Sequence, residues 1–318
     1  YDGHGIWGWC NIGVQTFFFL SGYLAASGKK DFNLQWITHK LKRILIPYWI
    51  YLTFVIPAIF LMDNLQINIP KVFLAYSGLM GFFWEYRIES IGVLWFVSYI
   101  MLCYIFTPFV NLFYYKACNY LAIKKSPGGQ TISLVVAVMS MALILQIVTI
   151  PLALAFKFKS AWISLYMFAF FYAKLCDTNK EVERLNKVIL MISVIGVLIR
   201  IWANDIQVAG LMENMVDLCI QYITCVQGAA IFIVIRRVCM EFEIFQQKIS
   251  RKIVLYICGI SYEIYIVQGF FCDGIFTSEL CGNYIMNSVV ILALVLLSAN
   301  ALSHLRIAMA KFADKWRN

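Results

Sequence analysis

Long apolar runs constrain the fold of this chain more than any other feature of its sequence. Nine of them are about 17 to 25 residues long and hold few charges, and an α-helix of that length crosses the hydrocarbon core of a bilayer. The runs lie at residues 12–28, 44–62, 91–115, 131–156, 160–176, 186–203, 218–240, 253–276 and 285–305. Because backbone polar groups in lipid must find partners within their own segment, each run is expected to be helical. The sequence therefore predicts an all-α, polytopic integral membrane helix bundle with nine spans.

One further apolar segment, residues 70–84, is shorter than these runs. Pro70, Gly78 and Gly81 favour a re-entrant or interfacial helix there over a tenth crossing. Hydrophobic residues make up 62% of the chain and charged residues 14%, which is far from the composition of a soluble globular domain. Without repeats or low-complexity tracts, residues 1–318 are predicted to form a single transmembrane domain.

Basic residues alternate between the two sides of the predicted spans. One set of loops holds most of the 26 lysines and arginines, at residues 29–43, 116–125, 174–187, 236–252 and 306–317. The opposite loops carry the acidic residues Asp205, Glu213, Asp217, Asp273 and Glu279. Cytoplasmic loops are enriched in Lys and Arg. The side of residues 29–43 and the C-terminus are therefore predicted to be cytoplasmic, and residue 1 external.

The composition also argues against two kinds of site. The formal net charge is +9, but the basic residues are spread over several short loops, so the lipid bilayer is the expected partner and nucleic acid is not. The ten cysteines lie mostly inside apolar runs, without Cys-x-x-Cys or Cys/His spacing. They predict neither a disulfide framework nor a metal site.

The segment HKLKRILIPYW, residues 39–49, concentrates three cations in four residues. If residues 33–43 form a helix along the membrane face, Lys40 and Arg43 are three apart and share a side. Together they can bind a phosphate-bearing group such as an anionic nucleotide tail. The alternative is a plain positive-inside anchor for the span that follows.

Small and aromatic residues adjoin in the first run, in FFFLSGYL at residues 17–24. A Ser-Gly pair in lipid usually marks a close helix crossing, which predicts a packing role for Ser21 and Gly22. Phe17 and Phe18 are expected to face lipid or the core rather than a cofactor.

Polar residues interrupt the eighth run, in GISYEIYIVQGFF. Ser261, Tyr265 and Gln268 follow three-to-four spacing on one stripe, beside Tyr262 and Glu263. Ionisable residues inside the membrane tend to face a cavity or a partner. The stripe is predicted to face the bundle interior, either along a substrate path or in hydrogen bonds between helices.

Two other groups of polar residues are candidates for substrate contact or catalysis. Glu85, Arg87 and Glu89, in an outer loop, can contact a polar acceptor such as a sugar, with a solvated loop as the alternative. No Ser/His/Asp set or metal-ligand spacing includes any of the three histidines, His4, His39 and His304.

These motifs in this order resemble acyltransferase family 3, the integral-membrane O-acyltransferases that include bacterial enzymes acetylating surface polysaccharides, lipopolysaccharide O-antigens and peptidoglycan. The resemblance covers nearly the whole chain. It is carried by residues 13–24, 39–49, 94–108 and 260–268.

The resemblance implies an enzyme of the inner cell membrane that holds no bound cofactor. Acetyl-CoA, or another acyl-CoA, is the implied donor substrate at the cytoplasmic face. The acyl group then crosses through the bundle to a hydroxyl of a glycan or lipid-linked saccharide outside. The alternative reading is a polytopic transporter or flippase for a glycan or small anion, since polar stripes between helices suit permeation as well.

Residue by residue, the resemblance assigns donor binding to Lys40 and Arg43, although a lysine where arginine is usual weakens the grip on phosphate. The family's other motifs fall on Phe17, Phe18, Ser21, Gly22, Trp95, Phe96, Ser261, Tyr265 and Gln268. At the last of these positions the family usually has histidine.

The family's essential histidine lies in its first helix, ten residues after an arginine, and acts as the general base or acyl carrier. No arginine precedes His4, so the resemblance assigns no catalytic residue in this chain and places that histidine upstream of Tyr1. An external first residue without a signal peptide gives the same expectation. A first helix then precedes residue 1, and a complete protein has about ten.

Overall fold

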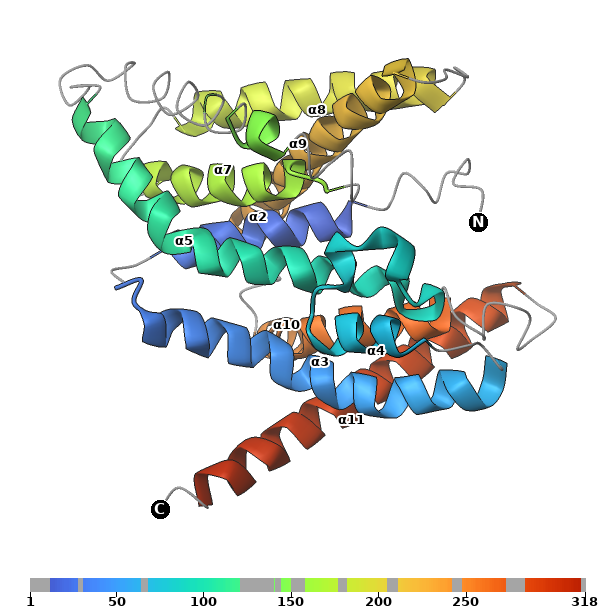
Figure 1. Cartoon of the computed structure of the whole chain (residues 1–318). Helices are drawn as coiled ribbons and strands as arrows, with labels where there is room; N and C mark the ends of the chain where they lie inside the picture. Colours follow the sequence, from blue (N-terminus) through green and yellow to red (C-terminus); the bar gives the residue numbers. More distant parts are fainter. Residues whose placement is uncertain are drawn as a thin grey trace. The chain divides into compact units, whose positions relative to one another are not determined.

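The computed structural model is helical throughout the part of the chain that it describes, with no strand among those residues (Figure 1). It describes residues 12–27, 31–63, 68–120, 140, 144–149, 158–176, 182–204, 211–241, 248–272 and 284–315. The predicted all-α, polytopic membrane fold is confirmed. Two compact units make up the chain, one from Tyr1–Phe32 and Ile105–Glu243, the other from Asn33–Tyr104 and Ile244–Asn318.

The first unit is built from long helices that pack through small residues and aromatic rings. They are α2 (Gly13–Ala26), the later part of α5 (Trp95–Tyr120), α7 (Ala161–Cys176), α8 (Val182–Asn204) and α9 (Leu211–Glu241). Helix α2 packs against α7 and α9. Phe19 of α2 lies at the centre of this core, with its ring centroid 4.9 Å from Phe232 and 5.5 Å from Tyr172.

The second unit combines three long helices with a short, irregular segment. The long helices are α3 (Leu34–Asp63), α10 (Lys248–Cys272) and α11 (Tyr284–Lys315). The irregular segment holds α4 (Ile69–Tyr76) and the 3₁₀ turns η1 (Met80–Phe82), η2 (Trp84–Tyr86) and η3 (Glu89–Leu94). Helix α10 packs against α11, α3 and η3, and the start of α5 continues from η3.

Helix α3 begins ten residues before the span predicted at 44–62. Leu34–Asp63 is one continuous helix with Pro47 inside it, so the basic segment belongs to the same helix as the span. Proline removes a single helical hydrogen bond. The carbonyl that loses its donor is that of Arg43, and the Tyr262 hydroxyl donates to the next one, that of Ile44, at 3.0 Å.

Six of the described helical segments are long and apolar enough to cross a membrane. These are 34–61, 89–116, 182–202, 215–241, 251–271 and 286–309, with 161–175 a shorter apolar helix. Most of the span predicted at 131–156 lies outside the described residues. Within it, residue 140 and residues 144–149 are described, and they are helical. In the segment 70–84, the eight residues of α4 would reach about 12 Å, too short to cross.

Candidate functional site

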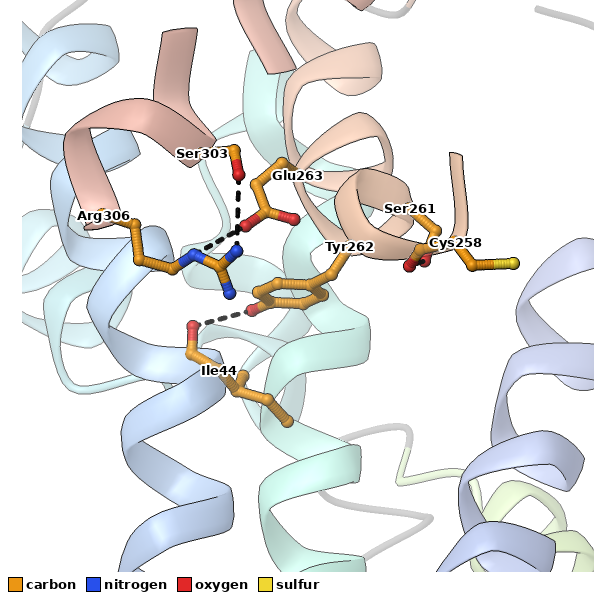
Figure 2. A network of polar contacts seen from close by, with 7 residues as sticks. All are labelled: Ile44, Cys258, Ser261, Tyr262, Glu263, Ser303 and Arg306. Atoms are coloured by element: carbon orange, nitrogen blue, oxygen red, sulfur yellow. Dashed lines mark hydrogen bonds and ion pairs between the residues drawn. The ribbon is translucent and has the colours of Figure 1, made fainter. Parts of the chain in front are cut away.

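Two adjacent side chains of α10 join the three long helices of the second unit. Tyr262 donates its hydrogen bond to Ile44 of α3, and Glu263 forms an ion pair with Arg306 of α11, at 3.0 Å between Oε1 and Nε. Figure 2 shows these partners converging from the three helices. The contacts join the middle of α10 to the N-terminal part of α3 and to the C-terminal part of α11.

Each of the three helices carries basic residues toward one of its ends, and we call these residues the basic end of the second unit. They are Lys40, Lys42, Arg43, Arg251, Lys252, Arg306 and Lys311. Such an end suits an anionic ligand or an anionic membrane surface.

Lys40 is held by two aromatic rings. Its ammonium lies 5.7 Å from the ring centroid of Trp36 and 5.7 Å from that of Tyr104, and the two rings meet edge to face at 5.9 Å. Cation–π attraction of this kind orients a flexible lysine. Lys40 is half-buried, whereas Arg43, one turn further along α3, is exposed. Because both residues lie on helix α3, their three-residue spacing places the two side chains on one face, where they can bind one phosphate group together.

The ion pair between Glu263 and Arg306 is the most buried charge interaction among the described residues. The Glu263 side chain is 1% exposed and that of Arg306 is 25% exposed. Arg306 also donates from Nη2 to the Ser303 hydroxyl at 3.3 Å. The sequence pattern does not predict this pair, because Arg306 follows the last apolar run and belongs to a basic segment at its end. The signal was available, since a carboxylate inside an apolar helix needs a cation.

The predicted polar stripe of α10 separates into different roles. Tyr265 donates its hydroxyl hydrogen to the Val93 carbonyl at 2.6 Å, and its ring meets Phe96 edge to face at 5.0 Å. Ser261 bonds back to Cys258 of its own helix at 3.0 Å. Gln268 is half-buried and makes no hydrogen bond within the described part of the chain. At Tyr265 the stripe therefore forms a hydrogen bond between elements, one of the two interpretations left open by the sequence.

The start of α5 is fixed against the 3₁₀ segment before it. A Cβ on Gly81 would overlap the carbonyl oxygen of Trp95, and the Gly81 N–H donates to the Ser98 hydroxyl at 2.9 Å. The Trp95 ring packs edge to face on Tyr99 at 5.9 Å. Only a glycine permits this close approach, so the sequence ties the irregular segment to a rigid helix.

The 3₁₀ segment exposes charged and aromatic side chains. The Arg87 guanidinium stacks 4.1 Å from the centre of the Trp84 ring, while Glu85, Tyr86 and Glu89 are exposed. The η3 turn that ends this segment packs on the C-terminal half of α10, where Tyr265 donates to Val93. We call residues 84–89 the aromatic segment.

The motif of the first run lies in the first unit and serves packing. A Cβ on Gly22 would overlap the carbonyl oxygen of Tyr166 and come within 3.0 Å of the Ala169 Cβ. Phe18 stacks on Trp162 with 6.3 Å between ring centroids. Ser21 is buried with Gly22, and Phe17 is half-buried. This geometry matches the close helix crossing expected from the sequence.

Comparison with known proteins identifies the family. The model of a family described as an acyltransferase domain, acyltransferase family 3, matches residues 1–304. The chain belongs to acyltransferase family 3. It is therefore a multi-pass membrane acyltransferase, and the resemblance drawn from the four motifs is confirmed. Neither a curated protein nor a solved structure matches the chain.

Membership of this family bears on two parts of the second unit, the basic end and the aromatic segment. An acyltransferase must bind an activated acyl donor and an acceptor. The basic end offers cations at helix ends, and the aromatic segment offers rings and carboxylates. The Phe17, Phe18, Ser21 and Gly22 motif lies in the other unit.

Proposed function

We propose that this family 3 acyltransferase transfers an acetyl group from acetyl-CoA to a hydroxyl of a cell-surface or exported carbohydrate, in the inner cell membrane. The observation that carries the proposal is the pair Lys40 and Arg43, three residues apart on α3, with Lys40 oriented by the rings of Trp36 and Tyr104. Lys40 and Arg43 bind the phosphates of coenzyme A in this account. The arginine fork contacts two phosphate oxygens, and the oriented lysine supplies a point charge.

The acceptor is proposed to bind at the aromatic segment. Saccharides present apolar ring faces and hydroxyl groups, which suit aromatic side chains and charged hydrogen-bonding groups such as Glu85 and Glu89. In this account donor and acceptor bind at opposite faces of the membrane, with the basic end in the cytoplasm, where the excess of Lys and Arg places it.

The transfer itself exchanges a thioester for an ester. The acceptor hydroxyl oxygen attacks the acyl carbonyl carbon, a C–O bond forms and the C–S bond breaks. The hydroxyl proton is removed by a base, and the departing coenzyme A thiolate takes up a proton. Positive charge beside the donor favours the binding of the anionic nucleotide.

The test is the acetyl content of the surface carbohydrate in a strain that lacks the gene. NMR of the purified polymer is expected to show loss of O-acetyl groups and recovery on complementation with the native gene. Arg43→Ala is expected to weaken donor binding about tenfold, since one charged hydrogen bond is lost, and so to restore acetylation only partly. Lys252→Ala removes an equal charge from the basic end and is the control.

Two results would count against the proposal. Unchanged O-acetyl content in the deletion strain would contradict transfer to that carbohydrate. Loss of the entire polymer would instead favour the transporter or flippase reading.

A further inference from the structure

The hydroxyl of Tyr262 reaches across to the turn of α3 that carries the donor-binding pair. It donates to the carbonyl oxygen of Ile44 at 3.0 Å, between residues 218 apart in sequence. Ile44 directly follows Arg43 and lies four residues after Lys40. Figure 2 shows the Tyr262 side chain extending from α10 to the α3 backbone at this point.

A proline makes this turn the weak part of α3. Pro47 has no N–H, so the carbonyl of Arg43, four residues earlier, lacks its helical donor, and the proline ring crowds that carbonyl. Proline is a common site of bending in helices. The Tyr262 hydroxyl supplies a donor to the next carbonyl along, which restrains the turn from outside the helix.

The residue next to Tyr262 restrains α10 in turn. Glu263 is paired with Arg306 of α11, whose guanidinium is also bonded to Ser303. A buried ion pair with this geometry holds two helices in one register, because breaking it leaves a charge in an apolar surrounding. Arg306 and Tyr262 thus form a chain of contacts from α11 through α10 to α3.

We infer that Tyr262 is a positioning residue for the acyl donor: its hydrogen bond to Ile44 holds the proline-weakened turn so that Lys40 and Arg43 face the same phosphate group. The inference rests on the proposed function, because it presumes that this pair binds the donor. The Tyr262 hydroxyl bonds to the backbone of α3, and in this account it does not bind the donor itself. It acts through Arg43, and its loss is expected to change donor affinity more than the rate of transfer.

The experiment compares two tyrosine-to-phenylalanine variants in native membrane vesicles, with acetyl-CoA varied and the acceptor polysaccharide fixed. Tyr262→Phe removes the bond to Ile44. Tyr48→Phe removes a bond of the same kind from the same helix, since the buried Tyr48 hydroxyl donates to the Ala75 carbonyl at 2.6 Å. Tyr262→Phe is expected to raise the KM for acetyl-CoA about threefold to tenfold, the range of one hydrogen bond, with kcat nearly unchanged. Tyr48→Phe is expected to leave the KM within about twofold, because its bond holds α4 rather than the donor pair.

A double variant separates positioning from a general structural effect. Once Arg43→Ala has removed the group being positioned, Tyr262→Phe is expected to raise the KM little further. Full additivity of the two changes would overturn the inference, as would equal KM values for Tyr262→Phe and Tyr48→Phe.

A second route covers the case in which Tyr262→Phe does not fold. Glu263→Gln keeps the side-chain shape but weakens the contact with Arg306, and it is expected to raise the KM in the same direction. An unchanged KM in that variant would overturn the inference. A native enzyme that shows no saturation with acetyl-CoA would contradict the proposed function itself, which is a different outcome from saturation with unaltered KM values in the variants.

Discussion

Helix α2 of the first unit and helix α10 of the second differ in the contacts that join them most closely to their neighbours. In the first unit, Gly22 of α2 and Gly228 of α9 let backbones approach so closely that a Cβ at either position would collide with the neighbouring helix. In the second unit, side chains reach across to backbone carbonyls, as Tyr262 does to Ile44 and Tyr265 to Val93. The crossing at Gly22 is packed by shape, whereas Tyr262 and Tyr265 join α10 to its neighbours by hydrogen bonds.

The difference separates two motifs, at residues 17–24 and 260–268, that both place polar residues inside an apolar run. Lipid provides no hydrophobic drive for helices to associate, so close packing of small residues and interhelical hydrogen bonds are the available forces. The aromatic-Ser-Gly motif uses the first and the polar motif of α10 uses the second. Substitutions should therefore act by overlap at Gly22 of α2 and by loss of polar partners at Tyr262, Glu263 and Tyr265 of α10.

The largest effect is expected at the buried ion pair. Arg306→Met removes the cation and leaves the Glu263 carboxylate buried, which should lower the free energy of unfolding by about 3 kcal/mol. Thermal unfolding of the purified protein in detergent measures the loss. Adding Glu263→Gln to the same variant should recover part of the stability, and no recovery would show that the pair is not what holds these helices.

The first unit should respond to one added methyl group. Gly22→Ala places a Cβ against the backbone of Tyr166, which cannot move aside, and should destabilise the protein by about 1 to 3 kcal/mol. Gly259 of α10 has nothing within 4 Å of an added Cβ. Gly259→Ala should therefore be neutral or stabilise by up to about 1 kcal/mol. Equal melting temperatures for the two variants would contradict packing by close approach.

A smaller effect is expected where a single hydrogen bond is lost. Tyr265→Phe leaves the Val93 carbonyl without this donor and should lower the free energy of unfolding by about 1 kcal/mol. The exposed Tyr256 serves as the control, since Tyr256→Phe removes a hydroxyl that faces outward. If the control lost as much stability in the same assay, the bond to Val93 would have no special part in the unit.

The smallest effect is expected for an exposed ion pair of the first unit. Lys187 and Glu183 are one turn apart on α8, with 3.3 Å between their charged atoms and side chains 73% and 71% exposed. Solvent screens such pairs and side-chain entropy opposes them. Glu183→Gln should leave the melting temperature unchanged, and a clear shift would mean that burial does not separate the two kinds of pair.

Helix positions could be predicted from the sequence because hydrophobic run length is a local property. Residues 12–28 and 160–176, for example, were marked as spans and contain α2 and α7. The start of α3 was placed too late because the basic residues before Pro47 interrupt the apolar pattern. A helix can continue through both features when the bundle satisfies its backbone.

The polar partners could be predicted only in part. Ser261, Tyr265 and Gln268 were correctly placed on one face of a helix, because their spacing is local. The partners of α10 were not predicted, because Ile44 is 218 residues from Tyr262 and Arg306 lies on a different helix from Glu263. Such pairings depend on tertiary packing, and charge alternation fixes only which ends of helices lie together.

The central claim is that the basic end of the second unit binds the acyl donor through Lys40 and Arg43. The most direct test is equilibrium binding of coenzyme A to the purified protein in lipid nanodiscs, for the native protein, Arg43→Ala and Lys252→Ala. Arg43→Ala is predicted to raise the Kd about tenfold, and Lys252→Ala by less than about twofold, although each removes one positive charge. Equal weakening by both variants would show a nonspecific attraction to positive charge and would contradict the account.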